Sequence, residues 1–356
     1  MKKSAALPVI TTRLLDWYKE HKRDLPWRET TDAYSVWISE VILQQTRVAQ
    51  GSDYYVRFMR RFPNVCLLAE ADEQEVLKLW QGLGYYSRAR NMHTAAKQIV
   101  SRFNGRFPSH YSDILSLKGI GAYTAAAISS IAFNESFAVV DGNVFRVIAR
   151  LFAIETPIHT SDGKKTITEI AQQLIDRDHP GTYNQGIMDF GAVICTPRQP
   201  KCADCPLQST CMAYSLGRVS DFPVINRKIN IKNRYFNYFH IVDGDKTYLQ
   251  KRDHADIWKN LYEFPLIETS SPADFMQLEQ MPEFRELFSG IPSLSVDYPL
   301  TLKHQLTHQV IHTHFYRVTI PEQFTYRQPG KVIEIEKEKL SDYPISRLTH
   351  KYLETI

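Results

Sequence analysis

Four cysteines lie close together in the second half of the chain, and thiolates in such groups bind metals. They are Cys195, Cys202, Cys205 and Cys211 in the spacing C-x6-C-x2-C-x5-C, and only Cys66 lies elsewhere. So few other cysteines argue against a disulfide framework. A structural zinc usually takes two CxxC pairs, whereas iron–sulfur clusters accept uneven loops. The spacing therefore favours a [4Fe–4S] cluster, with zinc as the alternative.

Two acidic residues have surroundings suited to acid–base chemistry. Glu40 has Val36, Trp37 and Leu43 at helical spacing, and these apolar neighbours should raise its pKa and keep a proton available. Asp141 follows an apolar run where a helix begins, and a capping carboxylate there is held ionised. A protonated and an ionised carboxyl together can protonate a leaving group and stabilise a cation. The alternatives are a surface glutamate and a purely structural cap.

A turn with two glycines joins two expected helices over residues 117–125. Gly119 and Gly121 allow positive φ and a close approach of the backbone to a partner. Free amides at the start of the second helix would form an anion site, next to the positive charge of Lys118. The alternative is a helical hairpin in which the glycines only cap a helix.

The elements that position these residues change character along the chain. Helical periodicity predicts helices over residues 33–50 (capped by Asp32), 73–81, 87–103, 111–117, 122–133, 144–152 and 164–176. Alternating or β-branched runs predict strands over 234–243, 247–252, 312–320 and 331–335. The sequence therefore predicts a helical domain over residues 1–215, a polar linker over 216–233 and an α+β domain over 234–356.

The composition is typical of an intracellular two-domain protein. The chain has a mass of 41.2 kDa, 43% hydrophobic residues, a net charge of +4 and a pI near 8.6. That charge permits a polyanionic partner without requiring one. No run approaches the roughly 18 apolar residues of a membrane span. No long apolar stretch precedes Thr11, so we expect no signal peptide. We expect a cytoplasmic, nucleoid-associated monomer with no membrane partner.

The hairpin, the Val140–Asn143 motif and the cysteine loop, in this order, resemble the endonuclease III superfamily of base-excision glycosylases. Within it, residues 37–48, 81–90 and 140–143 and the second domain are similar to the adenine DNA glycosylase branch. The resemblance implies an all-α helix–hairpin–helix domain with an iron–sulfur loop over 195–211, followed by a C-terminal α+β Nudix-like domain. Tyr123 stands where bifunctional members carry a lysine nucleophile, which implies a monofunctional glycosylase.

The resemblance also implies roles for individual residues. Glu40 would protonate adenine at N7, and Asp141 would stabilise the cationic sugar. Tyr123 and Asn143 would assist at the sugar, and Gln185 and Arg28 would lie in the adenine pocket. In addition, Gln45 and Tyr85 would wedge into the base stack around a flipped adenine, and Lys118, Gly119 and Gly121 would hold a backbone phosphate.

The second domain is expected to read the lesion. Residues 257–265 resemble the entry of a Nudix fold, but residues 267–275 lack the glutamate cluster of Nudix hydrolases, which implies binding without hydrolysis. Relatives commonly carry Phe-Ser-His where this chain has Leu306, Thr307 and His308, so Thr307 and His308 are the expected contacts with 8-oxoguanine. The alternative is that these histidines belong to a half-exposed strand pair.

The implied partner is duplex DNA containing an A:8-oxoguanine or A:G mispair; no protein partner is indicated. One alternative is an endonuclease III-like pyrimidine glycosylase with lyase activity, against which Tyr123 and the extra domain argue. Two others are a non-catalytic damage-binding module and an iron–sulfur electron carrier on the same scaffold. The presence of both Glu40 and Asp141 argues against a pure binder.

Overall fold

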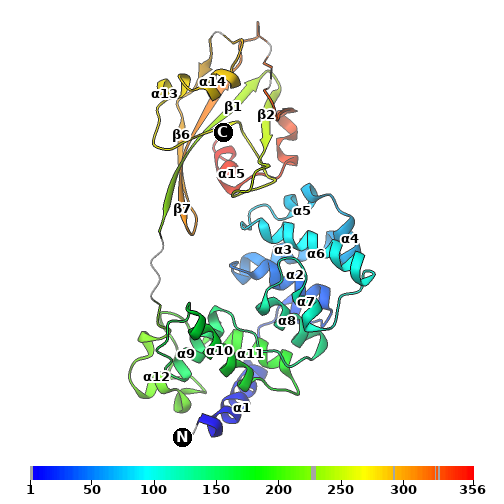
Figure 1. Cartoon of the computed structure of the whole chain (residues 1–356), viewed down its shortest axis with the longest axis vertical. Helices are drawn as coiled ribbons and strands as arrows, with labels where there is room; N and C mark the ends of the chain where they lie inside the picture. The colour runs from blue at the N-terminus through cyan, green and yellow to red at the C-terminus, as the bar shows by residue number, and fades with distance from the viewer. Residues whose placement is uncertain (1–2, 226–229, 292, 325, 328) are drawn as a thin grey trace. The chain divides into compact units, whose positions relative to one another are not determined.

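The computed structural model describes residues 3–225, 230–291, 293–324, 326–327 and 329–356 (Figure 1). The chain divides into two compact units. The helical unit comprises Met1–Glu70 and Asn91–Arg227, and the sheet unit comprises Ala71–Arg90 and Lys228–Ile356. The predicted linker over residues 216–233 includes residues 226–229, which lie outside the described residues, and its described part contains the short helix η3 (Val219–Asp221).

The helical unit is built from helices joined by short turns. They are α1 (Lys3–His21), η1 (Pro26–Arg28), α2 (Ala33–Leu43), α3 (Val48–Arg61), α4 (Val65–Glu70), α7 (Tyr111–Leu115), α8 (Ala122–Phe133), α9 (Gly142–Leu151), α10 (Ser161–Leu174), α11 (Pro180–Val193), η2 (Gln208–Thr210) and α12 (Met212–Ser215). Helix α6 (Ser87–Phe103) begins in the sheet unit and continues into the helical unit. The bounds of α6 and α8 are those that the sequence pattern predicts.

One predicted helix is wrong, because the stretch over residues 33–50 is two helices. Asp32 caps α2 as expected, with its Oδ2 accepting from the amide of Ser35 at 2.8 Å. However, α2 ends at Leu43 and α3 begins at Val48, because Gln45 adopts a left-handed backbone with φ 57°. No glycine or proline marks this break, so the apolar periodicity predicts one continuous helix where the structure has two.

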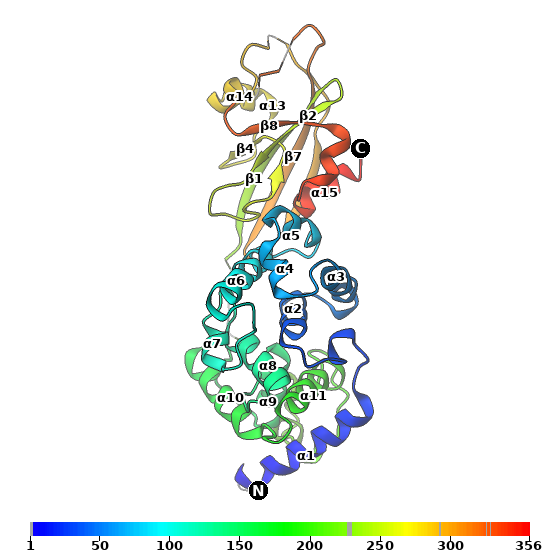
Figure 2. The ribbon, with the colours of Figure 1, turned by 90° about the vertical axis from the view of Figure 1, so that its right-hand side faces the viewer.

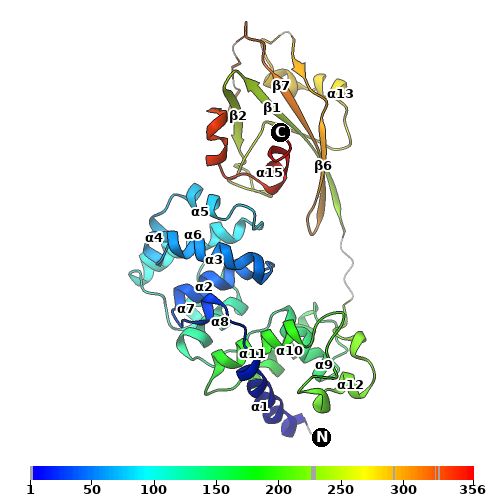
Figure 3. The same ribbon diagram turned by 180° about the vertical axis from the view of Figure 1, so that it is seen from behind.

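One hydrophobic core of the helical unit lies between α1, α9, α10 and α11 (Figure 3). Apolar side chains such as Leu14, Ile148, Ile187 and Phe190 fill it. Helix α8 packs against α2, α7 and α11, and α9 packs against α11 and α12. These contacts hold α2, α8 and α9 together within the helical unit.

The sheet unit contains one eight-stranded sheet among its described residues. Its elements are α5 (Glu73–Leu79), β1 (Lys232–Asp243), β2 (Lys246–Lys251), β3 (Tyr262–Glu263), β4 (Leu266–Thr269), α13 (Phe275–Glu279), α14 (Pro282–Leu287), β5 (Ser295–Val296), β6 (Leu300–Gln305), β7 (Gln309–Thr319), β8 (Val332–Glu336), η4 (Lys337–Asp342) and α15 (Arg347–Leu353). The central pair β1 and β7 is parallel, while β6 and β7 form an antiparallel hairpin.

Helices cover both faces of this sheet, with α13 and α14 on one side and α15 on the other (Figure 2). Because successive side chains of a strand point to opposite faces, β1 contributes to both layers. Phe239 and Ile241 pack with α13 and α14, whereas Phe236 and Tyr238 pack with α15. A strand buried on both faces loses the simple alternation of apolar and polar residues.

Residues 71–90 belong to the sheet unit by their contacts, although the chain reaches them before α6. Tyr86 donates its hydroxyl to the Ile345 carbonyl at 3.1 Å, and Arg90 donates to the Lys259 carbonyl at 2.8 Å. Lys78 donates to the Ser341 carbonyl. The sequence pattern does not indicate these contacts, because each joins positions far apart in the chain.

The hairpin between α7 and α8 provides a matched test of glycine. Gly119 has φ +77°, and a Cβ there would lie 2.5 Å from the Cβ of Asn91, whereas Gly121 has φ −95° and open space around it. We expect Gly119→Ala to lower the free energy of unfolding by about 1–2 kcal/mol or more. Gly121→Ala should change it by less than about 0.5 kcal/mol. Thermal unfolding followed by circular dichroism measures both, and equal losses would contradict the assignment.

Candidate active site and cysteine pocket

A cavity of about 660 Å³ opens in the helical unit between η1, α2, α8, α9 and α11. This volume lies in the range of ligand pockets. Many of the residues predicted from the sequence line it together, although they are far apart in the chain: Arg28, Glu40, Gln45, Tyr123, Asp141, Asn143 and Gln185.

Glu40 lies at the centre of this group, since α2 packs against α8. The Tyr123 hydroxyl donates to Glu40 Oε2 at 2.6 Å. Burial raises the pKa of Glu40 to about 7, and the charge of Asp141 adds to the rise, while Tyr123 and Arg28 oppose it. A carboxyl with this pKa holds a proton in a large fraction of molecules near neutral pH and can act as a general acid.

Asp141 is the N-cap of α9, as the sequence predicts. Its Oδ1 accepts from the Val144 amide at 2.8 Å, and its Oδ2 accepts from Asn143 Nδ2 at 2.8 Å. Burial raises the pKa of Asp141, and these hydrogen bonds act against the rise because they favour the charged form. Asp141 is therefore fixed in direction by its own helix, with Asn143 as its immediate partner.

Residues of α11 and η1 also line the cavity. Gln185 accepts from the Tyr18 hydroxyl at 3.0 Å, and Met188 Sδ lies 3.3 Å from the Tyr123 hydroxyl. Arg28 is paired with the buried Asp189 of α11. Met188 and Asp189 were not predicted from the sequence; the one available signal is that Asp189 is the only charged residue among residues 180–193.

The two residues predicted to wedge into DNA share an unusual backbone. Gln45 has φ 57° and Tyr85 has φ 47°, the left-handed region that side chains seldom adopt. Both are exposed, and Tyr85 retains half of its accessible surface. An exposed side chain on a strained backbone is a frequent feature of functional sites.

The predicted phosphate site is exposed at the start of α8. Lys118, Gly119 and Gly121 are all on the surface, and α8 has no side-chain cap at Gly121. The amide of Lys118 is not among the donors turned outward, because it donates to Gln98 Oε1 at 2.7 Å.

In the sheet unit, Thr307 and His308 are exposed at the tip of the β6–β7 hairpin. The hydroxyl of Thr307 lies 3.0 Å from the hydroxyl of Tyr85. Two residues predicted separately, one as a wedge and one as a lesion contact, are thus hydrogen-bonded within one unit.

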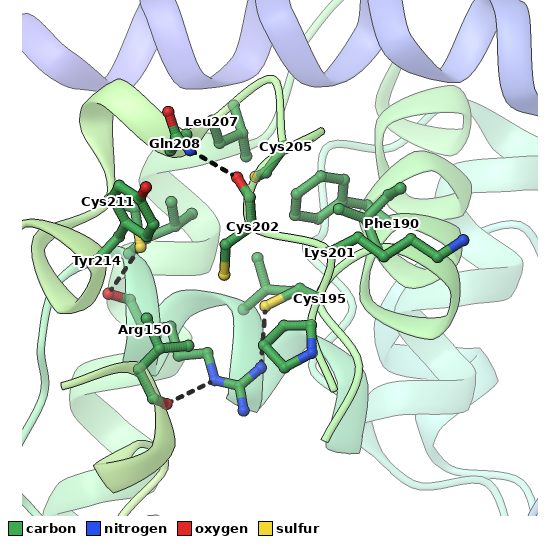
Figure 4. Close-up of a pocket in the computed structure, with 15 residues that line it drawn as sticks. Arg150, Phe190, Cys195, Lys201, Cys202, Cys205, Leu207, Gln208, Cys211 and Tyr214 are labelled. Carbon is green, nitrogen blue, oxygen red and sulfur yellow. Dashed lines mark hydrogen bonds between the residues drawn. The ribbon is translucent and has the colours of Figure 1, made fainter. Parts of the chain in front are cut away.

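The four clustered cysteines line a small apolar pocket between α9, α11 and the loop before α12 (Figure 4). None forms a disulfide. Burial raises the pKa of the Cys202, Cys205 and Cys211 thiols, that of Cys205 to about 12. Within the described residues, no group of three or more His, Cys, Asp and Glu side chains is arranged to hold a metal ion.

Two arginines of α9, one turn apart, hold the loop that begins at Cys195. Arg150 donates to the Cys195 sulfur at 3.4 Å and to the Thr196 carbonyl at 2.7 Å. Arg146 donates to the Cys195 carbonyl at 2.7 Å and to Asn143 Oδ1 at 2.9 Å. Arg146 therefore connects the cysteine loop to the partner of Asp141, a link that the sequence pattern did not indicate.

Comparison with known families agrees with this architecture. Residues 38–177 match the HhH-GPD superfamily of base excision DNA repair proteins, and residues 237–355 match the NUDIX domain. The chain is 35% identical to an adenine DNA glycosylase of Buchnera aphidicola (Acyrthosiphon pisum) over 266 residues, which cover 74% of this chain and 76% of the relative. It is 38% identical to the Arabidopsis thaliana adenine DNA glycosylase over 307 residues, covering 74% of this chain and 48% of the relative. It is 43% identical to the mouse adenine DNA glycosylase over 231 residues, which cover 62% of this chain and 45% of the relative.

These matches place the chain in the class of base-excision DNA repair proteins of the helix–hairpin–helix superfamily, with a Nudix-like domain in addition. Within that class, the chain belongs to the adenine DNA glycosylase family. The predicted family and fold class are confirmed. The chain spans slightly less than half the length of the Arabidopsis and mouse relatives.

Solved structures give the same fold for the helical part. A thermostable thymine-DNA glycosylase aligns with a TM-score of 0.57 and 30% identity, covering 61% of this chain and 100% of that chain. A non-covalent endonuclease III–DNA complex aligns with a TM-score of 0.53 and 19% identity, covering 61% and 99%, and supports the fold alone. No helix of the described residues has the length and apolar character to cross a membrane.

The hydrogen bond between Tyr123 and Glu40 gives a direct test of the cavity's electrostatics. Because this bond favours the carboxylate, Tyr123→Phe should raise the pKa of Glu40 from about 7 by roughly one unit. A carbon NMR titration of the Glu40 carboxyl measures it. Tyr298→Phe, at a fully exposed tyrosine, is the control. A lowered or unchanged pKa in Tyr123→Phe would show that the bond does not favour the charged form.

Proposed function

We propose that this protein is a monofunctional adenine DNA glycosylase that removes adenine paired with 8-oxoguanine or guanine in duplex DNA. The observation that carries the proposal is the cavity in which Tyr123 bonds to a Glu40 of raised pKa beside the fixed carboxylate of Asp141. The relatives named as adenine DNA glycosylases support the choice of base. The protein is proposed to act in the cytoplasm, on nucleoid DNA.

The two carboxyls divide the reaction between them. Adenine must leave the base stack to reach the cavity. Glu40 then gives its proton to N7, so that the bond between the base and sugar C1′ breaks and its electron pair leaves with the neutral adenine. Asp141 stabilises the positive charge that develops on the sugar. Water adds to C1′ and releases a proton, leaving an abasic site.

The same arrangement argues against a lyase. A Schiff base with the sugar requires an amine nucleophile, and the hydroxyl of Tyr123 occupies the position at the start of α8 that faces Glu40. An endonuclease III-like glycosylase with lyase activity is therefore the weaker candidate. Trapping with borohydride distinguishes the two, because only a Schiff base is captured.

Recognition of the duplex is assigned to exposed residues of both units. Gln45 in the helical unit and Tyr85 in the sheet unit would fill the space in the stack around the extruded adenine. Thr307, bonded to Tyr85, and His308 would contact the 8-oxoguanine. Lys118 and the start of α8 would hold a phosphate without reading sequence.

A [4Fe–4S] cluster with a structural role is the occupant proposed for the cysteine pocket. All four thiols face one apolar pocket, and Arg150, beside Cys195, adds a positive charge where thiolates would be negative. Burial disfavours free thiolates there, so a bound metal centre would supply the charge that draws off their protons. Zinc is the alternative occupant.

The proposed activity predicts the behaviour of Glu40→Gln. With a duplex carrying one A:8-oxoguanine pair, wild type should release adenine in a single turnover, and the strand should break only after alkali. Glu40→Gln should bind the duplex with unchanged affinity and lose about 10²–10⁴-fold in excision rate, because a general acid contributes on that order. Wild-type excision should also fall as pH rises through about 7, where Glu40 loses its proton.

Asp53→Asn is the matched control for this experiment, since it makes the same type of change at an exposed residue of α3. Duplexes with A:G and A:T pairs measure the preference for the lesion. Tight binding by wild type without adenine release would replace the glycosylase proposal with the damage-binding one. Normal excision by Glu40→Gln would remove Glu40 from the role of general acid.

The cluster assignment predicts the metal content. Anaerobically purified protein should carry about four iron and four sulfide per chain and little zinc. Cys202→Ser should lose this iron and lower the melting temperature, whereas Cys66→Ser, at an exposed cysteine outside the pocket, should retain it. One zinc per chain that depends on Cys202 would establish the zinc alternative.

A further inference from the structure

A carboxylate without contact to solvent lies behind the wall of the cavity. The Asp189 side chain has 0% of its surface exposed and receives the guanidinium groups of two arginines. Arg28 approaches end-on, with NH1 donating to Oδ2 and NH2 donating to Oδ1, the latter at 2.7 Å. Arg23 donates from Nε to Oδ1 at 2.9 Å. The pairing with Arg28 is bidentate, which fixes the plane of its guanidinium as well as its position.

The surroundings connect Asp189 to the reacting groups. Gln185, Met188 and Asp189 lie on one face of α11, at helical spacing. Gln185 lines the cavity, and Met188 contacts the Tyr123 hydroxyl that bonds to Glu40. Arg28 lines the same cavity as Glu40, is only 12% exposed, and lowers the pKa of Glu40 through its charge.

An arginine that lines the same cavity as a carboxyl can pair with it, and bidentate pairs are among the strongest polar contacts in proteins. Here the end-on face of Arg28 is already occupied by Asp189, and the negative charge of Asp189 offsets the positive charge of Arg28. The pKa of Asp189 is lowered by these two arginines despite its burial, so it remains ionised. Arg28 is therefore fixed in position, and the nearby negative charge of Asp189 weakens the electrostatic effect of Arg28 on Glu40.

We propose that Asp189 is a positioning residue for the excision reaction: it holds Arg28 on the wall of the base cavity and prevents it from forming an ion pair with Glu40. We call the pairing of Asp189 with Arg28 the clamp. The inference rests on the proposed function, because it holds that the clamp serves to keep the proton on Glu40. Arg28 then keeps N–H groups available for the base, while Glu40 keeps its proton for the leaving group.

The charged and titratable groups that face Glu40 come from three elements. They are Tyr123 of α8, Asp141 at the start of α9 and Arg28 of η1. Around Asp189, the corresponding groups are Arg23, Arg28 and Tyr18, whose ring lies 5.8 Å from the Arg28 guanidinium carbon. Removing the Asp189 charge thus acts on Glu40 chiefly through Arg28.

The test is the pH profile of single-turnover adenine release by Asp189→Asn. With its charge no longer offset, Arg28 should favour the Glu40 carboxylate, so the fall in rate at high pH should move to lower pH by about one unit. The rate above that fall should drop about tenfold, while duplex affinity is unchanged. Asp53→Asn should show the wild-type profile.

A second pair of variants tests whether Asp189 acts through Arg28. Arg28→Gln and the double variant Arg28→Gln/Asp189→Asn should share one pH profile, because without the cation there is nothing for Asp189 to hold. Different profiles for these two would overturn the proposal, and this comparison remains available if Asp189→Asn alone does not fold. A lower melting temperature in Asp189→Asn with the wild-type pH profile would also overturn it, leaving a purely structural ion pair.

Failure of the proposed function gives a different result. Wild type would then release no adenine, and the clamp would be tested by the pKa of Glu40 in the NMR titration, which needs no substrate. Asp189→Asn should lower that pKa in the wild-type background and leave it unchanged in the Arg28→Gln background. An unchanged value in both backgrounds would refute the clamp.

Discussion

Burial of the Glu40 carboxyl against α8 is the constraint on which the proposed chemistry of the helical unit depends. Desolvation is the largest cause of its raised pKa, and every neighbouring group adjusts that value up or down. A carboxyl in water would be ionised at neutral pH and have no proton to give. The packing of α2 on α8 therefore lets Glu40 keep a proton near neutral pH, while Tyr123, Asp141 and Arg28 set how strongly it holds that proton.

Helix α9 connects the cavity with the loop that carries the cysteines. Its N-cap Asp141 faces the cavity, and Arg146 and Arg150, further along the same helix, hold the loop that carries the cysteines. Arg146 also donates a hydrogen bond to Asn143, the hydrogen-bond partner of Asp141. A displacement of the cysteine loop would therefore shift Asn143 through the side chain of Arg146. A structural metal centre there would stabilise the cavity without taking part in bond breaking.

The sequence was sufficient where chemistry depends on residue type within a local motif. The Asp32 cap, the bounds of α8 and the position of Asp141 all follow from neighbouring residues. It was insufficient where a contact joins distant positions. Asp189 is the only charged residue of α11, and nothing in the neighbouring sequence indicates that Arg23 and Arg28 pair with it. The break at Gln45 was missed because its left-handed backbone is held by tertiary structure, without glycine.

The segment over residues 71–90 shows that position in the sequence does not tell to which structural unit a residue belongs. It precedes most of the helical unit in sequence, yet its side chains bond to the sheet unit through Tyr86 and Arg90. Tyr85 on this segment therefore meets Thr307 of the β6–β7 hairpin through contacts internal to one unit. Under the proposed function, the side chains that examine the lesion are positioned together by the sheet unit. Under the same proposal, the acid Glu40 and the sugar-stabilising carboxylate Asp141 are positioned together by the helical unit, so substitutions at Thr307 should alter lesion preference without altering the pKa of Glu40.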